Sequence, residues 1–479
     1  MPGLEHRGPM KAVPIFRTKR LRRVLTALPV AVICAVTVFV GFPALGADSE
    51  KRLFIITSFP ETLFKRFTVA FEEAHPGVRV KVLNKKTSAA ISYVQDQIAN
   101  RPDVFWASAP DAFEVLKESG DLEKFVFDAP GVADVIGNYP INDPEGFYTG
   151  FAISGYGMMW NTRYMARHSL RPPHEWGDLT APAYHRHLGI TAPSRSGTTH
   201  LMVEGILQNH GWKEGWALLM EIGGNLATVT ARSFSVVDGV NSGRFGIGLV
   251  IDFLGLSSKA SGLPVDFAYS ATTPFVPANV AVLKNAQNRE LAETFIKFLL
   301  SGKGQRILFE PEIHRLPVVR GAYEKAPLGY PNPFGASALV GDVSFDSRRS
   351  RLRYHLVNAM FDTLITFRVR KLNRVWAAIH RAEALLRNSS NADAATSIAK
   401  ARRLASEVPI SAPLSMDPEF TSIFIRKQRG RSVPDQQLNL EKTWDETVTR
   451  NLLEALRIAE AQAKALETTS DADSTGTVR

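Results

Sequence analysis

From Lys51 onward the chain alternates short apolar runs with segments of helical period, and this alternation restricts the possible folds more than any other feature. Residues 53–57 and 78–82 have the pattern of strands, and residues 64–74 between them carry apolar side chains at helical spacing. A second helical period at 91–98 precedes the strand-like segment 103–106. This order predicts an α/β fold with parallel strands and right-handed crossovers. Ligands bind such sheets beyond the carboxyl ends of the strands.

Two polar loops follow predicted strands of this first series. Ser58 comes directly after the first strand and Ser108 comes shortly after the third. Each hydroxyl lies beside a predicted helix start, where it could contact a ligand or could only cap the helix. Both serines are therefore candidate ligand-binding residues with an ordinary structural alternative.

A second α/β series begins after a glycine-containing, strand-rich stretch at 146–161. Residues 277–283 read as a strand that returns to the first series, and 288–300 as a strongly apolar helix. Two crossings between two series predict two lobes with a cleft, the usual place of a small-molecule site. We assign the first lobe to residues 48–150 and 265–335, and the second lobe to residues 151–264.

The loop at 191–199 is the strongest binding candidate in the second lobe. It follows the strand 188–190, precedes a helix, and contains Ser194, Arg195, Ser196, Gly197, Thr198 and Thr199. Hydroxyls and free backbone N–H groups at a helix N-terminus favour a phosphate or carboxylate, and Arg195 could add a bidentate contact. The alternative is that Ser196 or Thr198 only caps the helix.

Two further residues follow strands in the same lobe. Asp252 ends the apolar run 249–251, so it could accept hydrogen bonds from ligand hydroxyls or could cap a helix. Arg232 follows the strand 226–230 and is a weaker candidate, because an arginine in a loop is more often a solvated charge. His174, His185, His187 and His200 are too irregularly spaced for a metal site, and we expect them at the surface.

The first 47 residues have the pattern of an export signal. A positive flank precedes an apolar run at 24–42, and small residues at 43–47 suit a signal peptidase. An uncleaved membrane anchor is the alternative, because a largely apolar run of 19 residues nearly spans a bilayer. We expect the rest of the chain in the periplasm. The only cysteine, Cys34, lies in the apolar run, so the mature chain would have no thiol.

Charge and motifs exclude several classes of function. Residues 48–335 carry 28 basic and 29 acidic residues, which disfavours nucleic-acid binding by the two lobes. There is no nucleophile elbow, no zinc-protease helix, no phosphate loop and no dinucleotide fingerprint. We therefore expect a chain that is not an enzyme and that has no cofactor and no metal site.

Residues 336–479 predict a helical extension. Apolar stripes at 351–386, 391–408 and 440–466 indicate three helices, residues 409–434 read as a loop, and the polar tail 467–479 is expected to be disordered. The stripes could pack on a lobe or could form a docking surface, to which basic residues between 348 and 353 would contribute.

Several segments, in this order, resemble the bacterial extracellular solute-binding proteins of the ferric-iron and organophosphate branch. They are Thr57-Ser58, Asp103-Val104-Phe105-Trp106, Trp160-Asn161-Thr162, Trp176-Gly177-Asp178-Leu179, Ser194-Arg195-Ser196-Gly197-Thr198-Thr199, residues 295–305 and Arg315-Leu316-Pro317-Val318. Among the family, the chain is similar to members that regulate phosphoglycerate transport. The resemblance implies a two-lobed periplasmic-binding-protein fold of type 2, here followed by an all-helical extension.

The resemblance also implies a ligand and a partner. The ligand would be a small organic anion, a phosphorylated acid such as phosphoglycerate, and the partner an ABC permease or a sensor histidine kinase in the membrane. Iron-binding members use adjacent tyrosines, and the chain has no Tyr-Tyr pair, so ferric iron is the less favoured cargo. A scaffold that acts through the helical extension, without ligand transport, is the other alternative.

Overall fold

The computed structural model describes residues 51–96, 100–125, 130–136, 138–335, 343, 345–387, 389–425 and 432–475, with side chains up to 468. The predicted export segment and Cys34 lie outside these residues. None of the helices in the described part is both long and apolar enough to cross a membrane.

The first sheet has six strands in the order β13-β6-β12-β3-β1-β2. Their bounds are β13 Leu316–Pro317, β6 Thr149–Ser154, β12 Val276–Val282, β3 Val104–Ala107, β1 Lys51–Thr57 and β2 Val78–Asn84. Strand β1 pairs in parallel with β2 and β3, which confirms the predicted β-α-β-α-β order. The helices of this lobe are α1 Glu61–Ala74, α2 Thr87–Asp96, α3 Pro110–Glu118, α9 Arg289–Leu300 and α10 Gly302–Ile307. A short hairpin joins β4 Val135–Ile136 and β5 Tyr139–Pro140.

An aromatic cluster fills the centre of this lobe. The indole of Trp106 on β3 meets Phe59 and Phe67 edge-on at ring distances of 5.1 and 5.6 Å, and Phe151 and Phe295 at 5.2 and 5.6 Å. All five side chains are buried. Edge-to-face packing of this kind holds the end of β1 and the loop after it in a fixed position.

The second sheet has five strands in the order β11-β7-β10-β8-β9. Their bounds are β11 Val265–Tyr269, β7 Tyr156–Asn161, β10 Ile247–Ile251, β8 Leu188–Thr191 and β9 Leu226–Thr230. The helices around it are α4 Thr162–Arg167, α5 Gly197–His210, α6 Trp212–Gly224, α7 Ser233–Asn241 and α8 Asp252–Ala260. The chain enters this sheet between β6 and β7 and leaves it between β11 and β12. Residues 151–154, expected in the second lobe, thus belong to the first sheet, and residues 265–269, expected in the first lobe, belong to the second sheet.

Gly155 marks the first crossing between the sheets. A Cβ atom at this position would lie 2.9 Å from the Tyr269 ring and 3.0 Å from the Phe275 ring, so only glycine fits without displacing an aromatic side chain. Strand β6 ends at Ser154 in the first sheet and β7 begins at Tyr156 in the second sheet. The two sheets are therefore joined here by a single residue.

The C-terminal region is helical, as predicted, but its elements differ in detail. The helices are α11 Ser347–Leu352, α12 Tyr354–Leu364, α13 Val369–Leu386, α14 Ala392–Ala405, α15 Ala412–Ser415, α16 Pro418–Ser422 and α17 Asp435–Thr475. The single helix expected at 351–386 is broken twice, and two short helices lie in the expected loop at 409–434. The tail from residue 467 was expected to be disordered, and this expectation is wrong as far as Thr475, because α17 continues to that residue.

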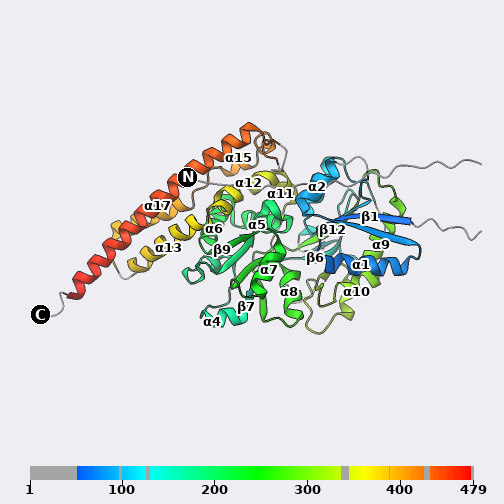
Figure 1. Ribbon diagram of the computed structural model, residues 1–479, viewed down its shortest axis with the longest axis horizontal. Helices are drawn as coiled ribbons and strands as arrows, with labels where there is room; N and C mark the ends of the chain where they lie inside the picture. Colours follow the sequence, from blue (N-terminus) through cyan, green and yellow to red (C-terminus); the bar gives the residue numbers. More distant parts are fainter. Residues whose placement is uncertain are drawn as a thin grey trace, which may run out of the picture. The chain divides into compact units, whose positions relative to one another are not determined.

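The inner side of the C-terminal helices is buried against the second lobe. Trp376 on α13 is 1% exposed, and a Cβ at Gly224 of α6 would lie 2.6 Å from it. Asn373 donates hydrogen bonds to the carbonyls of Gly224 and Leu226 at 2.7 and 3.1 Å. Figure 1 shows α17 running alongside α13, and Arg374 pairs with Glu460 across them at 3.0 Å. Of the two alternatives for the apolar stripes, packing on a lobe is therefore the one found on this inner face.

Candidate anion-binding pocket

A pocket lies at the carboxyl ends of strands from both sheets. The first lobe lines it with Ser58, Phe59, Pro60, Asn84, Lys85, Lys86, Thr87 and Ser108, and the second with Arg195, Ser196, Thr198, Arg232, Ser233, Phe234, Ile251, Phe253 and Leu254. Its space, including the part open to solvent, measures about 510 Å³.

Five helices begin at this pocket. Pro60 precedes α1, Thr87 is the first residue of α2, Thr198 lies in the first turn of α5, Ser233 begins α7 and Phe253 lies in the first turn of α8. The N-terminal end of a helix carries partial positive charge and unpaired backbone N–H groups. Their convergence on one space makes it favourable for an anion.

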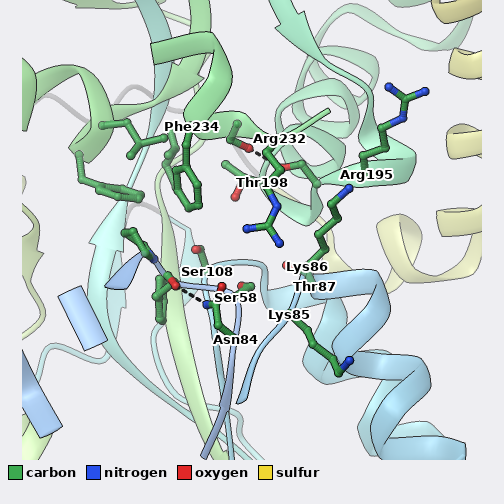
Figure 2. Close-up of a pocket in the computed structure, with 17 residues that line it drawn as sticks. Ser58, Asn84, Lys85, Lys86, Thr87, Ser108, Arg195, Thr198, Arg232 and Phe234 are labelled. Carbon is green, nitrogen blue, oxygen red and sulfur yellow. Dashed lines mark hydrogen bonds between the residues drawn. The ribbon is translucent and has the colours of Figure 1, made fainter. Parts of the chain in front are cut away.

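The charged side chains of the pocket have the same sign. Lys85, Lys86, Arg195 and Arg232 line it, and none of the described lining residues is Asp or Glu. Figure 2 shows the Arg232 guanidinium pointing into the pocket toward Ser58 and Ser108, whereas Arg195 and Lys85 point away from it. Arg195 also lines two neighbouring cavities. Arg232, the weaker candidate by sequence, is thus the arginine aimed at the centre.

Ser196 both caps a helix and lines the pocket, so the two interpretations of the 191–199 loop are not exclusive. Its hydroxyl accepts a hydrogen bond from the Thr199 N–H at 3.2 Å, which satisfies one free donor at the start of α5. It also lies 2.7 Å from the Ser233 hydroxyl at the start of α7. The two serines therefore hold two helix starts together at the wall of the pocket.

The loop after β2 lines the pocket, although the sequence analysis did not identify it. The Asn84 amide donates hydrogen bonds to the carbonyls of Thr57 and Phe59 at 3.2 and 2.6 Å, and this fixes the loop that carries Ser58. Lys85, Lys86 and Thr87 follow directly. The sequence contained the information needed to find this loop, because the loop also follows the carboxyl end of a parallel strand.

Four predicted site residues do not line the pocket. Ser194 faces a neighbouring cavity beside α12, and Thr199 is buried in α5. Gly197 lies at a close approach, because a Cβ there would be 2.9 Å from Thr87. Asp252 is 1% exposed and its side chain is used elsewhere. Of the histidines expected at the surface, His174 is exposed, but His200 is fully buried.

Asp252 joins the two sheets at their crossing instead of facing a ligand. Its carboxylate accepts hydrogen bonds from the Gly155 and Phe253 N–H groups, both at 2.7 Å, and from the Tyr269 hydroxyl at 3.1 Å. Burial raises the pKa of Asp252 to about 6, against the lowering effect of these hydrogen bonds and of Arg315. Burial also lowers the pKa of Arg315 to about 9, with the Asp252 charge acting in the opposite direction.

Arg315 contacts two aromatic residues of the pocket wall. Its guanidinium lies 3.6 Å from the centre of the Phe253 ring and 4.6 Å from that of Phe59, and both rings line the pocket. One nitrogen donates to the Ser154 hydroxyl at 3.2 Å. A positive charge in contact with both rings adds to the positive potential of the pocket.

Replacing Asp252 with asparagine is expected to flatten the pH dependence of stability between about pH 4 and pH 6. A pKa of about 6 in the folded protein, above the ordinary 3.8, means that the folded state binds the extra proton. The contribution of Asp252 to stability is then fully present below pH 3.8 and is lost as the pH rises through 6. At about 1.4 kcal/mol per pKa unit, the loss is at most about 3 kcal/mol.

Urea unfolding at pH 4 to 7 measures this effect as the difference between the native chain and Asp252→Asn. Asp266→Asn is the matched control, because Asp266 is partly exposed and pairs with Lys259 on the surface. Parallel pH curves for the native chain and Asp252→Asn would show that the carboxylate keeps an ordinary pKa.

Comparison of the sequence with known proteins gives a family and a close relative. Residues 99–334 match the family described as bacterial extracellular solute-binding protein. The phosphoglycerate transport regulatory protein PgtC of Salmonella typhimurium is 34% identical over 382 residues, 79% of this chain and 91% of that protein. An uncharacterized protein of Haemophilus influenzae is 24% identical over 278 residues, 55% of this chain and 77% of its own length.

Solved structures show the same fold. The periplasmic binding protein AfuA of Actinobacillus pleuropneumoniae, with fructose-6-phosphate bound, matches 66% of this chain and 99% of its own at a TM-score of 0.59 and 19% identity. Iron-bound HitA of Pseudomonas aeruginosa matches 68% of this chain and 99% of its own at a TM-score of 0.53 and 17% identity. The fold is the two-lobed periplasmic-binding-protein fold of type 2, followed by a helical C-terminal region. With a relative of this identity along most of both sequences, the chain belongs to the family of bacterial extracellular solute-binding proteins.

Proposed function

We propose that this chain is exported to the periplasm, where it captures a small phosphorylated organic acid such as phosphoglycerate. It presents this ligand to an ABC permease or reports it to a sensor kinase in the membrane. One observation carries the proposal: five helices begin at the pocket, and its described lining residues include four basic side chains and no acidic one. The similarity to a phosphoglycerate transport regulatory protein and to a fold relative holding a sugar phosphate supports the class of ligand.

The pocket supports binding by residues from both lobes. We assign the phosphate to Arg232, whose guanidinium can form two parallel hydrogen bonds to it, together with the hydroxyls of Ser58 and Ser108. Thr198 and Ser196 present hydroxyls from the start of α5. A ligand that contacts both lobes favours their closed arrangement, and this preference is all that a binding protein needs.

The composition of the pocket wall argues against the alternative cargo and against catalysis. Ferric iron prefers hard anionic oxygens, and the described lining residues include no tyrosine and no carboxylate. The matching family is one of solute-binding proteins, and the relatives with a stated role are a transport regulatory protein and a periplasmic binding protein. We therefore propose binding without turnover.

Addition of 3-phosphoglycerate is expected to raise the melting temperature of the protein. At a hundred times its dissociation constant, a ligand that binds only the folded state adds about 2.7 kcal/mol. Fructose 6-phosphate, inorganic phosphate and ferric citrate are measured in parallel in a thermal-shift assay. A shift with ferric citrate alone would replace the proposal with iron binding, and no shift with any of the four would favour a scaffold role.

A further inference from the structure

A short C-terminal segment, residues 345–358, contacts both lobes, and we call it the clasp. Two of its contacts reach α3 of the first lobe. The Ser350 hydroxyl donates a hydrogen bond to the Asp111 carboxylate at 3.1 Å, and the Arg351 guanidinium pairs with Glu118. Asp111 and Ser350 are both fully buried. The clasp is therefore held on α3 by one buried contact and one contact at the surface, and the buried ring of Phe345 also lies 6.1 Å from that of Tyr139 in the same lobe.

Other residues of the clasp contact α5 of the second lobe. Arg353 donates two hydrogen bonds to one oxygen of Glu204, at 2.9 and 2.6 Å, and the two side chains are 4% and 0% exposed. The backbone of Asp346 exchanges hydrogen bonds with the Gln208 amide at 2.7 and 3.0 Å. Along the clasp, contacts to one lobe thus alternate with contacts to the other.

His200 is the point at which these contacts meet. One ring nitrogen lies 2.9 Å from the Asn358 amide oxygen, and the other lies 3.2 Å from the Ser350 hydroxyl and 3.3 Å from the Asp111 carboxylate. His200 belongs to α5 of the second lobe and Asp111 to α3 of the first. A buried polar network of this kind keeps its members in one arrangement, because separating them leaves unpaired groups in the protein interior.

On each lobe the network lies within three residues of the pocket wall. Asp111 follows Ser108 by three residues, and His200 follows Thr198 by two residues in the first turn of α5. A movement that separates Ser108 from Thr198 would therefore also separate Asp111 from His200, and would pull Ser350 away from one of them.

We propose that Ser350 and Arg351 are positioning residues for the pocket: they hold the first lobe against the second, and so couple the arrangement of the lobes to the C-terminal helices. The clasp favours the arrangement in which both lobes line the pocket. Breaking it populates a more open arrangement, and the apparent affinity for a ligand falls in proportion to the competent fraction. That the clasp holds the two lobes together does not depend on the proposed function. Only the effect on ligand affinity rests on the proposed function.

The distance between the lobes tests the clasp without any ligand. Spin labels are attached at Lys65→Cys on α1 and Arg163→Cys on α4, both exposed, in the full chain carrying Cys34→Ala. Pulsed electron resonance then compares Ser350→Ala/Arg351→Ala with the control Arg374→Ala/Arg381→Ala. The control residues pair with Glu460 and Glu467 of α17 and touch neither lobe through these pairs.

The clasp variant is expected to give a longer and broader distance distribution than the native chain, while the control gives the native one. An unchanged distribution in the clasp variant overturns the proposal, whatever the ligand is. Glu118→Gln supplies a second variant for which folding is not at issue, because Glu118 is 64% exposed; it should broaden the distribution in the same direction.

Saturating 3-phosphoglycerate is expected to restore the native distribution in the clasp variant, with an affinity about 3- to 10-fold weaker than that of the native chain. A longer distance that this ligand does not reverse would support the clasp and contradict the proposed function. A variant that binds the ligand with native affinity while its lobes are further apart would overturn the coupling.

Discussion

Replacing Arg232 with alanine is expected to weaken the binding of 3-phosphoglycerate by about 30-fold or more. Arg232 is the basic side chain that points to the centre of the pocket, toward Ser58 and Ser108. Arg232 is exposed without a ligand, and a ligand bound between the lobes would cover it. Loss of one partner from a buried, hydrogen-bonded charge pair costs about 2–5 kcal/mol, and 1.4 kcal/mol corresponds to a factor of ten. Isothermal titration calorimetry measures the change.

The matched control for this variant is Arg163→Ala, since Arg163 is an exposed arginine of the same lobe outside the pocket. It should leave the dissociation constant within about twofold, because the long-range effect of a surface charge is screened. Equal losses in both variants would mean that only the net charge attracts the ligand. No loss in Arg232→Ala would remove this residue from the site.

Replacing Arg353 with alanine is expected to lower the free energy of unfolding by about 3–5 kcal/mol. The variant leaves the Glu204 carboxylate inside the protein without its charged partner; one of its oxygens already has no hydrogen-bond partner among the described residues. It also removes the guanidinium that lies 4.7 Å from the centre of the Trp212 ring. Urea unfolding gives this change as a lower midpoint with the slope unchanged.

Arg374→Ala supplies the comparison for stability. Its ion pair with Glu460 joins α13 and α17 at the surface, where the two side chains are 69% and 52% exposed. Such a pair contributes about 0.2–1 kcal/mol. Similar effects of both variants would show that the contact between the C-terminal region and the second lobe is not a buried one.

Local patterns in the sequence were sufficient for most of the fold. The apolar runs of β1 to β3 and the helical periods between them predict parallel strands, because each pattern depends on nearest neighbours along one element. The bounds of the C-terminal helices were harder to predict from the sequence. Their breaks at Arg353 and Ile365 depend on what lies opposite, such as Glu204 and the glycines of α6, and these contacts come from distant parts of the chain.

The candidate site was predicted in part. Ser58 and Ser108 line the pocket, as predicted from their positions after the carboxyl ends of parallel strands. Asn84 has the same kind of position, so the same argument applies to it. The other site residues depend on side-chain conformation. Whether Arg195 or Arg232 points inward, and whether Asp252 faces a ligand or the Gly155 N–H, depends on side-chain packing that periodicity does not carry.

A crystal structure from crystals of the protein grown with 3-phosphoglycerate tests most directly the claim that this pocket binds a phosphorylated organic acid. We expect density for the ligand in the pocket between the lobes, with phosphate oxygens within hydrogen-bond distance of the Arg232 guanidinium and of the Ser58 or Ser108 hydroxyl. Ligand density at another place, or an empty pocket at a concentration that saturates binding in solution, would contradict the proposed site.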